Sequence, residues 1–146
     1  MCLGNFKHFR RQGCTALRTR LRVLTDIALV AYTSHMTEDF YCDEVLSGRT
    51  SVKVVAETDS VLAYHHTKPY WPVHIVVIPK RHVSSLLTLK EEDNQLLMEL
   101  LTVIKGVASE VVRENGACRV LTNLGQYQDS KHLHWHLNFG DPLKLH

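Results

Sequence analysis

Short runs of alternating or wholly apolar residues fill the middle of the chain and predict strands. The runs "SVKVVAET" and "SVLAYHHT" are rich in β-branched residues and meet at Thr58-Asp59-Ser60, a combination typical of turns. They therefore predict an antiparallel hairpin. The run "VHIVVIPK" is apolar at almost every position, which indicates a strand with both faces buried that ends at Pro79.

Between residues 88 and 116 the apolar spacing becomes that of a helix. Thr88, followed three residues later by Glu91, has the pattern of a capping box, and acidic residues fill the expected first turn. At the other end, Asn115-Gly116 predicts a left-handed cap. The residues expected on the apolar face are Leu97, Leu100, Leu101, Ile104, Val107, Ala108 and Val111.

Two further runs, "CRVLTNL" and "HLHWHLNF", follow this helix and predict strands. The chain of 146 residues is long enough for one domain with a real core. The order of strands, one helix and strands again predicts an α+β domain with an antiparallel sheet.

The stretch "SKHLHWHLNFG" places three histidines, His132, His134 and His136, at alternate positions. On a strand, residues two apart lie on the same face, roughly 6.6–6.8 Å from each other. The apolar residues between them would then point to the other face and pack against the helix. A single histidine here would be an ordinary polar residue of a surface strand, but three in register indicate a site.

Two chemistries use such a row of imidazoles. Neutral histidines can bind zinc with one coordination position left open. Alternatively, one histidine is a nucleophile while its neighbours bind phosphate and handle protons, which a pKa near about 6.5 allows. The spacing alone does not separate these two alternatives.

Composition and charge change this picture only at the N-terminus. Four cysteines without a repeating spacing indicate reduced thiols in a cytoplasmic protein. No apolar run is long enough to span a membrane. A net charge of +2 points to no nucleic-acid or membrane partner. Residues 1–35 hold six Lys/Arg and one acid, whereas residues 36–146 have a net charge of −3. Residues 1–35 are therefore expected to be a basic extension: a flexible tail, a targeting segment, or a non-native segment upstream of a true start at Met36.

The histidine row and the run "VLAYHHTKPYWPVHIVVIPKRHVSSLLTL" together resemble the histidine triad (HIT) family, from about Asp39 to Phe139. The resemblance implies a HIT-like fold over residues 36–146, with an antiparallel sheet of about five strands and one long helix. It also implies a homodimer formed through the helix and the adjacent strand. The implied activity is hydrolysis or transfer at the α-phosphate of nucleotide-like substrates.

The resemblance assigns roles to four histidines. His134 matches the nucleophile that forms a covalent phospho-histidine intermediate. His136 matches the residue beside the scissile phosphate, His132 the one that braces the row, and His74 the histidine of the preceding strand that completes the cluster. A third histidine at position 136 favours the hydrolase branches, because the transferase branches carry glutamine there.

The expected substrate-binding residues include both matches and departures. Gln128 and Asn123 lie at or near the family's glutamine and phosphate-binding asparagine. His66 stands where many members carry an acid that holds the ribose, so we expect weak discrimination between ribose and deoxyribose; it could instead donate to a backbone carbonyl in the turn before Pro69. Asp129 replaces a hydroxyl residue beside the phosphate, and Ser130 is the expected substitute.

No cofactor is expected, although weaker candidates for zinc ligands are present. Zinc-binding members carry Cys-x-x-Cys before the fold, where this chain has Asp39-Phe40-Tyr41-Cys42. Cys42, His82 and His132 could be three ligands, with Asp39 as a weaker fourth. The alternative is a buried Cys42 and a packing His82.

The sequence therefore predicts a cytoplasmic nucleotide phosphohydrolase of the HIT type. Two alternatives stay open: a nucleotide-binding HIT module with little turnover, which His66 and Asp129 favour, and a metal-dependent hydrolase that uses the triad as ligands.

Overall fold

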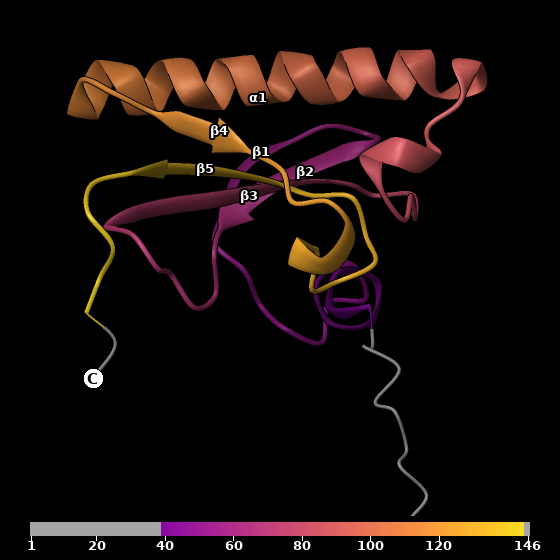
Figure 1. Cartoon of the computed structure of the whole chain (residues 1–146), viewed down its shortest axis with the longest axis horizontal. Coiled ribbons are helices and arrows are strands. Elements are labelled where there is room, and N and C mark those ends of the chain that lie inside the picture. The colour runs from indigo at the N-terminus through magenta and orange to yellow at the C-terminus, as the bar shows by residue number, and fades with distance from the viewer. Residues whose placement is uncertain (1–38, 145–146) are drawn as a thin grey trace, which may run out of the picture. The chain divides into compact units, whose positions relative to one another are not determined.

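A five-stranded antiparallel sheet carries one long helix on one face. The computed structural model describes residues 39–144, so the predicted extension 1–35 lies outside the described residues. The strands are β1 (Val54–Glu57), β2 (Val61–His65), β3 (Val73–Pro79), β4 (Arg119–Leu121) and β5 (Trp135–Phe139), in the order β1-β2-β3-β5-β4 (Figure 1). The predicted α+β class is confirmed. Within the described part, no helix is long and apolar enough to cross a membrane.

The helix α1 (Asn94–Asn115) covers one face of the sheet (Figure 1). Its buried stripe consists of Leu100, Val103, Ile104, Val107 and Val111, which pack in one cluster with Leu133, Trp135 and Leu137, as expected for the residues between the histidines. Leu101 was expected in this stripe but is 45% exposed. The reason is geometric: the positions three, four, seven and eleven after Leu100 share its face, and the next residue along the helix does not.

The predicted helix start is wrong by one turn. Thr88 closes a 3-10 turn, Leu86–Thr88, in which its hydroxyl bonds back to Ser85, so it cannot cap the next turn. A second 3-10 turn, Glu91–Asp93, then leads into α1, and the Asp93 carboxylate accepts the Lys90 N–H at 2.9 Å. The helix ends as predicted, with Gly116 at a φ of 84°.

The other face of the sheet carries a smaller core and a short π-helical turn, η1 (Tyr41–Leu46). Tyr41 and Val45 from this turn pack with Leu62, Tyr64, Val76 and Ile78. Val76 of β3 lies directly opposite His136 of β5, so His136 is on this face and not on the helix face. The turn η1 therefore covers the sheet beside the histidines.

Regular strand structure begins only at Trp135, so two of the three histidines precede β5. The Leu133 N–H donates to the Val83 carbonyl at 2.6 Å, beyond the end of β3. The segment 132–134 is therefore extended but departs from the ladder, and the histidines do not form one flat row. A last 3-10 turn, η4 (Gly125–Tyr127), lies between β4 and this segment.

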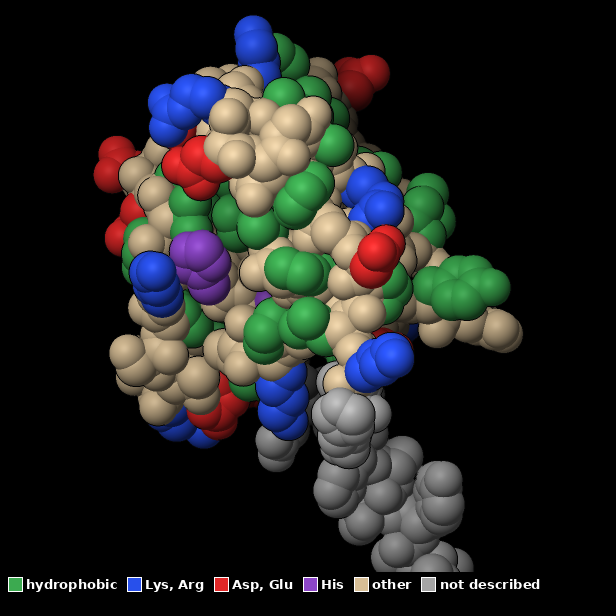
Figure 2. All heavy atoms as spheres, turned by 90° about the vertical axis from the view of Figure 1, so that its left-hand side faces the viewer, with side chains coloured by type: hydrophobic (Ala, Val, Ile, Leu, Met, Phe, Trp, Pro, Cys, Tyr) green, Lys and Arg blue, Asp and Glu red, His purple; other side chains and the backbone are tan. Residues whose placement is uncertain are grey.

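The end of the molecule where β5 finishes has a mixed surface. Figure 2 shows acidic and basic side chains interspersed among apolar ones on this face. The charges there do not gather into a basic stripe of the kind that nucleic-acid-binding surfaces carry.

Candidate active site

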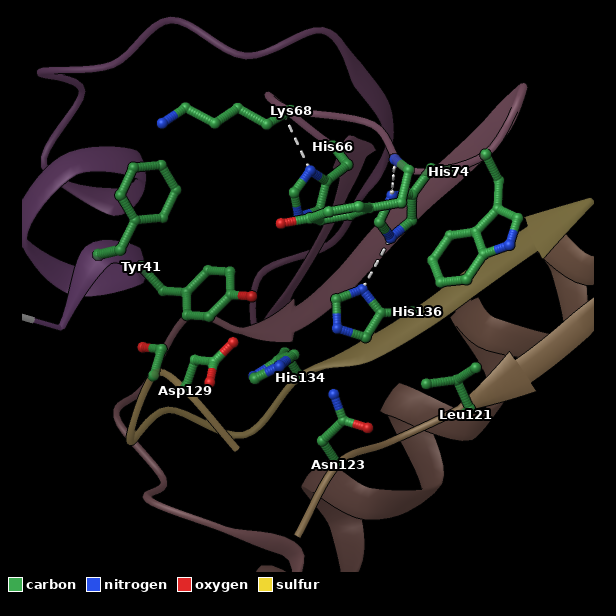
Figure 3. A pocket seen from close by; sticks show the side chains of 13 residues that line it. Tyr41, His66, Lys68, His74, Leu121, Asn123, Asp129, His134 and His136 are labelled. Carbon is green, nitrogen blue, oxygen red and sulfur yellow. Dashed lines mark hydrogen bonds between the residues drawn. The ribbon is translucent and has the colours of Figure 1, made fainter. Parts of the chain in front are cut away.

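A cavity of about 440 Å³ opens on the face of the sheet away from α1. Four histidines line it: His66, and three that Figure 3 shows on β3 (His74), on the segment before β5 (His134) and on β5 (His136). The other lining residues are Phe40, Tyr41, Lys68, Tyr70, Trp71, Leu121, Asn123, Asp129 and Ser130. The site thus combines imidazoles, aromatic side chains and one charge of each sign.

The ring of His134 has a fixed orientation. Its Nδ1 lies 2.7 Å from the His132 carbonyl oxygen, so Nδ1–H donates and the lone pair is on Nε2. Its backbone carbonyl accepts the Thr122 hydroxyl at 2.7 Å, and the Tyr41 ring lies 4.9 Å away. Burial lowers the pKa of His134. The side chain is therefore neutral at pH 7 and carries a nucleophilic nitrogen.

A second chain of hydrogen bonds fixes His136. The Tyr70 N–H donates to Nδ1 of His74 at 3.2 Å, so His74 must carry its proton on Nε2. That Nε2 donates to Nδ1 of His136 at 2.9 Å, which leaves His136 with an Nε2–H (Figure 3). Burial and neighbouring histidines lower the pKa of His74 to about 4 and that of His136 to about 3. His136 therefore presents a hydrogen-bond donor to the cavity.

His66 is held in the same way. Its Nδ1 accepts the Lys68 N–H at 3.0 Å, and its ring stacks on His74 at 4.1 Å with the planes only 6° apart. The alternative in which His66 donates to a backbone carbonyl before Pro69 has no counterpart among the hydrogen bonds of the described residues, where Nδ1 instead accepts a backbone N–H. Nitrogens of His66, His74 and His136 lie within 4.8 Å of one another, but four of them are occupied by these hydrogen bonds.

His132 lies beneath the cavity and is fully buried. Its Nε2 donates to the Pro79 carbonyl at 2.9 Å, and its own carbonyl holds the ring of His134. Its backbone carbonyl therefore fixes the ring of His134, while its Nδ1 lies 3.0 Å from Asp39.

Four donor atoms converge at this second location. The Cys42 sulfur lies 3.7 Å from Nδ1 of His82 and 3.4 Å from Nδ1 of His132, and one Asp39 oxygen lies 2.7 and 3.0 Å from the same nitrogens. A tetrahedral zinc with bonds of about 2.0–2.3 Å places its ligand atoms roughly 3.3–3.6 Å apart. The two separations from sulfur, 3.4 and 3.7 Å, are close to this ligand–ligand distance. The two separations from the carboxylate, 2.7 and 3.0 Å, are hydrogen-bond distances that would lengthen around a metal. One thiol, two imidazoles and one carboxylate within reach of one point are a donor set of the kind that zinc binds.

The surroundings of this cluster also suit a metal. The Pro79 carbonyl fixes the Nε2–H tautomer of His132 and so directs the Nδ1 lone pair at the cluster. Burial raises the pKa of the Cys42 thiol to about 11. Burial also acts to raise the pKa of Asp39, but hydrogen bonds from Cys42 to its carboxylate outweigh burial and lower that pKa to about 2. Binding of zinc would displace the thiol proton. The alternative of a buried Cys42 and a packing His82 does not describe the structure, since Cys42 is half-buried and His82 is exposed.

A comparison with family models decides which proteins this chain is related to. The HIT domain model matches residues 47–141, well over half of the chain. The chain belongs to the HIT domain family. The predicted resemblance is thereby confirmed.

Relatives of known sequence and structure agree. An uncharacterized HIT-like protein of Synechococcus elongatus is 34% identical over 110 residues, which is 74% of this chain and 96% of that protein. The structure of a histidine triad protein from Clostridium difficile is 31% identical with a TM-score of 0.62, covering 73% of this chain and 94% of that one. A HIT family hydrolase from Legionella pneumophila is 27% identical with a TM-score of 0.62, covering 68% and 90%.

The predicted substrate-binding residues of this HIT domain divide into two groups. Asn123, Ser130 and His66 line the cavity, as does Asp129. Gln128 does not: it is buried, and its Nε2 donates to the Ser84 carbonyl at 2.5 Å and to the His132 carbonyl at 3.4 Å. Its prediction as a substrate ligand needs correction, because its amide supports the carbonyl that holds His134.

Several residues of the site were not predicted from the sequence. Tyr41 comes from η1 and Phe40 directly precedes it, while Lys68, Tyr70 and Trp71 come from the loop between β2 and β3. The dense aromatic stretches "DFYC" and "KPYWP" were the available signal. Exposed aromatic side chains in loops are unusual in a small domain unless they form a binding surface.

Proposed function

We propose that this protein is a HIT family hydrolase that acts at the α-phosphate of a nucleotide-type substrate through a covalent intermediate on His134. The observation that carries the proposal is the hydrogen bond from Nδ1 of His134 to the His132 carbonyl, which leaves the Nε2 lone pair as the nucleophile. The similar Legionella pneumophila protein is a HIT family hydrolase, which supports the reaction class.

In the first step, Nε2 of His134 attacks phosphorus, a P–N bond forms, and the bond to the leaving group breaks. The Nε2–H of His136 donates to the phosphoryl group, where negative charge develops. Neutral His134 is essential here, because an imidazolium has no lone pair to attack with. In the second step, water attacks phosphorus and releases a proton to solvent, the P–N bond breaks, and its electron pair returns to Nε2 of His134.

Three lining residues are suited to hold the substrate in position. The amide of Asn123 lies beside His134 in Figure 3 and offers donors to phosphoryl oxygens. The aromatic side chains Phe40 and Tyr41, whose rings lie 5.9 Å apart, give a surface on which a base can stack.

The test is a panel of nucleoside phosphoramidates, dinucleoside polyphosphates and adenylylated amino acids. Turnover of at least one class by the wild type, and its loss in His134→Ala, is the expected result. His65→Ala is the matched control, because His65 lies on β2 outside the cavity lining. Equal turnover by His134→Ala and the wild type would refute the proposal.

A second candidate is a nucleotide-binding module with little turnover. Asp129 favours it, since its carboxylate lies beside His134 in Figure 3 and repels a phosphate there. Binding of nucleotides without hydrolysis of any member of the panel would identify this alternative. Asp129→Ser should then increase turnover.

Zinc at the four-residue cluster would be structural in this scheme. It would join η1, the end of β3 and the triad segment, and no catalytic step is assigned to it. A metal-dependent hydrolase using the triad is not supported, because His132 and His136 belong to different clusters and His134 to neither, among the described residues.

A further inference from the structure

One wall of the cavity consists of groups that donate hydrogen bonds. Because the Lys68 N–H occupies Nδ1 of His66, the other ring nitrogen of His66 carries a proton and acts only as a donor. Tyr70, whose ring lies 6.0 Å from that of His66, also lines the cavity, as does Lys68, whose ammonium is at the end of an extended side chain in Figure 3. Among the described residues that line the cavity, Lys68 is the one permanent cation and Asp129 the one acid.

The wall that contains His66 lies close to His136, beside which the α-phosphate of the substrate is proposed to bind. The His66 ring lies 5.9 Å from His136, so a ligand on the catalytic histidines extends past His66 within the length of a sugar. In Figure 3, Lys68 runs from His66 toward the side of the cavity that Tyr41 occupies. With a base stacked on Phe40 and Tyr41, the sugar would lie between the base and His134, beneath His66 and Lys68.

We infer that His66, Lys68 and Tyr70 bind an acidic group on the sugar of the substrate, a phosphate at the 2′ or 3′ position. This inference rests on the proposed function, because it needs the α-phosphate at His134. A neutral diol offers these three donors only weak acceptors, whereas a phosphate offers charged oxygens to an ammonium and two neutral donors. The carboxylate of Asp129 repels a phosphate on its own side of the cavity, so a second phosphate is expected to bind on the side of Lys68.

Calorimetric titration with AMP, ADP and adenosine 3′,5′-bisphosphate tests this. We expect the bisphosphate to bind the wild type at least about tenfold more tightly than AMP, and ADP to gain much less. Lys68→Met should remove most of this preference, Lys68→Arg should keep it, and His66→Gln, which retains an N–H donor, should keep part of it. Lys90→Gln is the matched control, because Lys90 is exposed and outside the cavity lining and loses the same charge.

The outcomes separate this inference from the function beneath it. Equal affinities for AMP and the bisphosphate, or a preference that Lys68→Met leaves intact, would overturn the sugar-phosphate site while the hydrolase proposal stands. If ADP gained as much affinity over AMP as the bisphosphate does, the second phosphate would bind as part of the polyphosphate chain, which would also overturn the sugar-phosphate site. Failure of all three nucleotides to bind would count against the proposed function itself.

Discussion

Acid should destabilise this fold through His136 in particular. In the folded protein its pKa is about 3, mainly because it is buried, whereas an unfolded histidine has a pKa of about 6.5. Between these two values the unfolded chain binds a proton that the folded chain does not, so stability is complete above about pH 6.5 and falls as the pH is lowered. From pH 7 to pH 5 this linkage amounts to about 2 kcal/mol at most, and about 1–2 kcal/mol with residual solvent screening.

The variant His136→Asn isolates this contribution. Asparagine does not titrate, and its carbonyl oxygen can accept the Nε2–H of His74 as Nδ1 of His136 does. Urea unfolding at pH 7 and pH 5, at one ionic strength, should show a loss about 1–2 kcal/mol smaller in His136→Asn than in the wild type. Equal losses in the two proteins, with equal m-values, would refute the claim that His136 is buried as a neutral ring.

Three further results are expected. His134→Ala should abolish turnover with folding retained, whereas His136→Ala should slow it by a smaller factor, about 10²–10⁴, as measured in steady-state assays. Metal analysis of purified protein should find zinc near one equivalent, and Cys42→Ser should lose it; wild-type protein free of metal after purification without chelators would contradict the fit. Light scattering should find a dimer, because three apolar side chains, Leu101 and Val112 on α1 and Val120 on β4, are each 45% exposed. Val112→Glu should shift the protein toward the monomer. A wild-type mass near that of the monomer, 16.7 kDa, would contradict this prediction.

The sequence was a good guide to the elements whose pattern is periodic or marked by a strong local signal. The apolar run of β3, the turn at residues 58–60 and the glycine cap of α1 all appear where they were expected. The helix start was missed because two possible capping residues, Thr88 and Asp93, lie close together in the sequence. The Thr88 hydroxyl bonds backward to Ser85, whereas the Asp93 carboxylate accepts the N–H of Lys90. The π-helical turn at Tyr41 has no periodic signature, so the turn itself was not predicted, and its contribution to the site was signalled by the aromatic stretch "DFYC" alone.

The site shows the same division. Spacing and resemblance predicted that His74, His134 and His136 lie together, and all three line one cavity. They could not show that Gln128 points away from it, because side-chain direction in an irregular segment depends on which backbone groups need partners. The resemblance also pointed to His132 as a partner of Asp39, Cys42 and His82, but the spacing could not separate this set from the triad, since His132 and Asp39 are 93 positions apart and meet only in the folded chain.

The central claim is that Nε2 of His134 becomes covalently bonded to phosphorus during turnover. The most direct measurement is rapid quenching under alkaline conditions, followed by peptide mass spectrometry of the wild type and of His136→Ala with a substrate found in the panel. We predict an acid-labile nucleotidyl adduct at residue 134 in both proteins, more abundant where the second step is slower, and none in His134→Ala. An adduct on another residue, or full turnover with no adduct at any time point, would contradict the account.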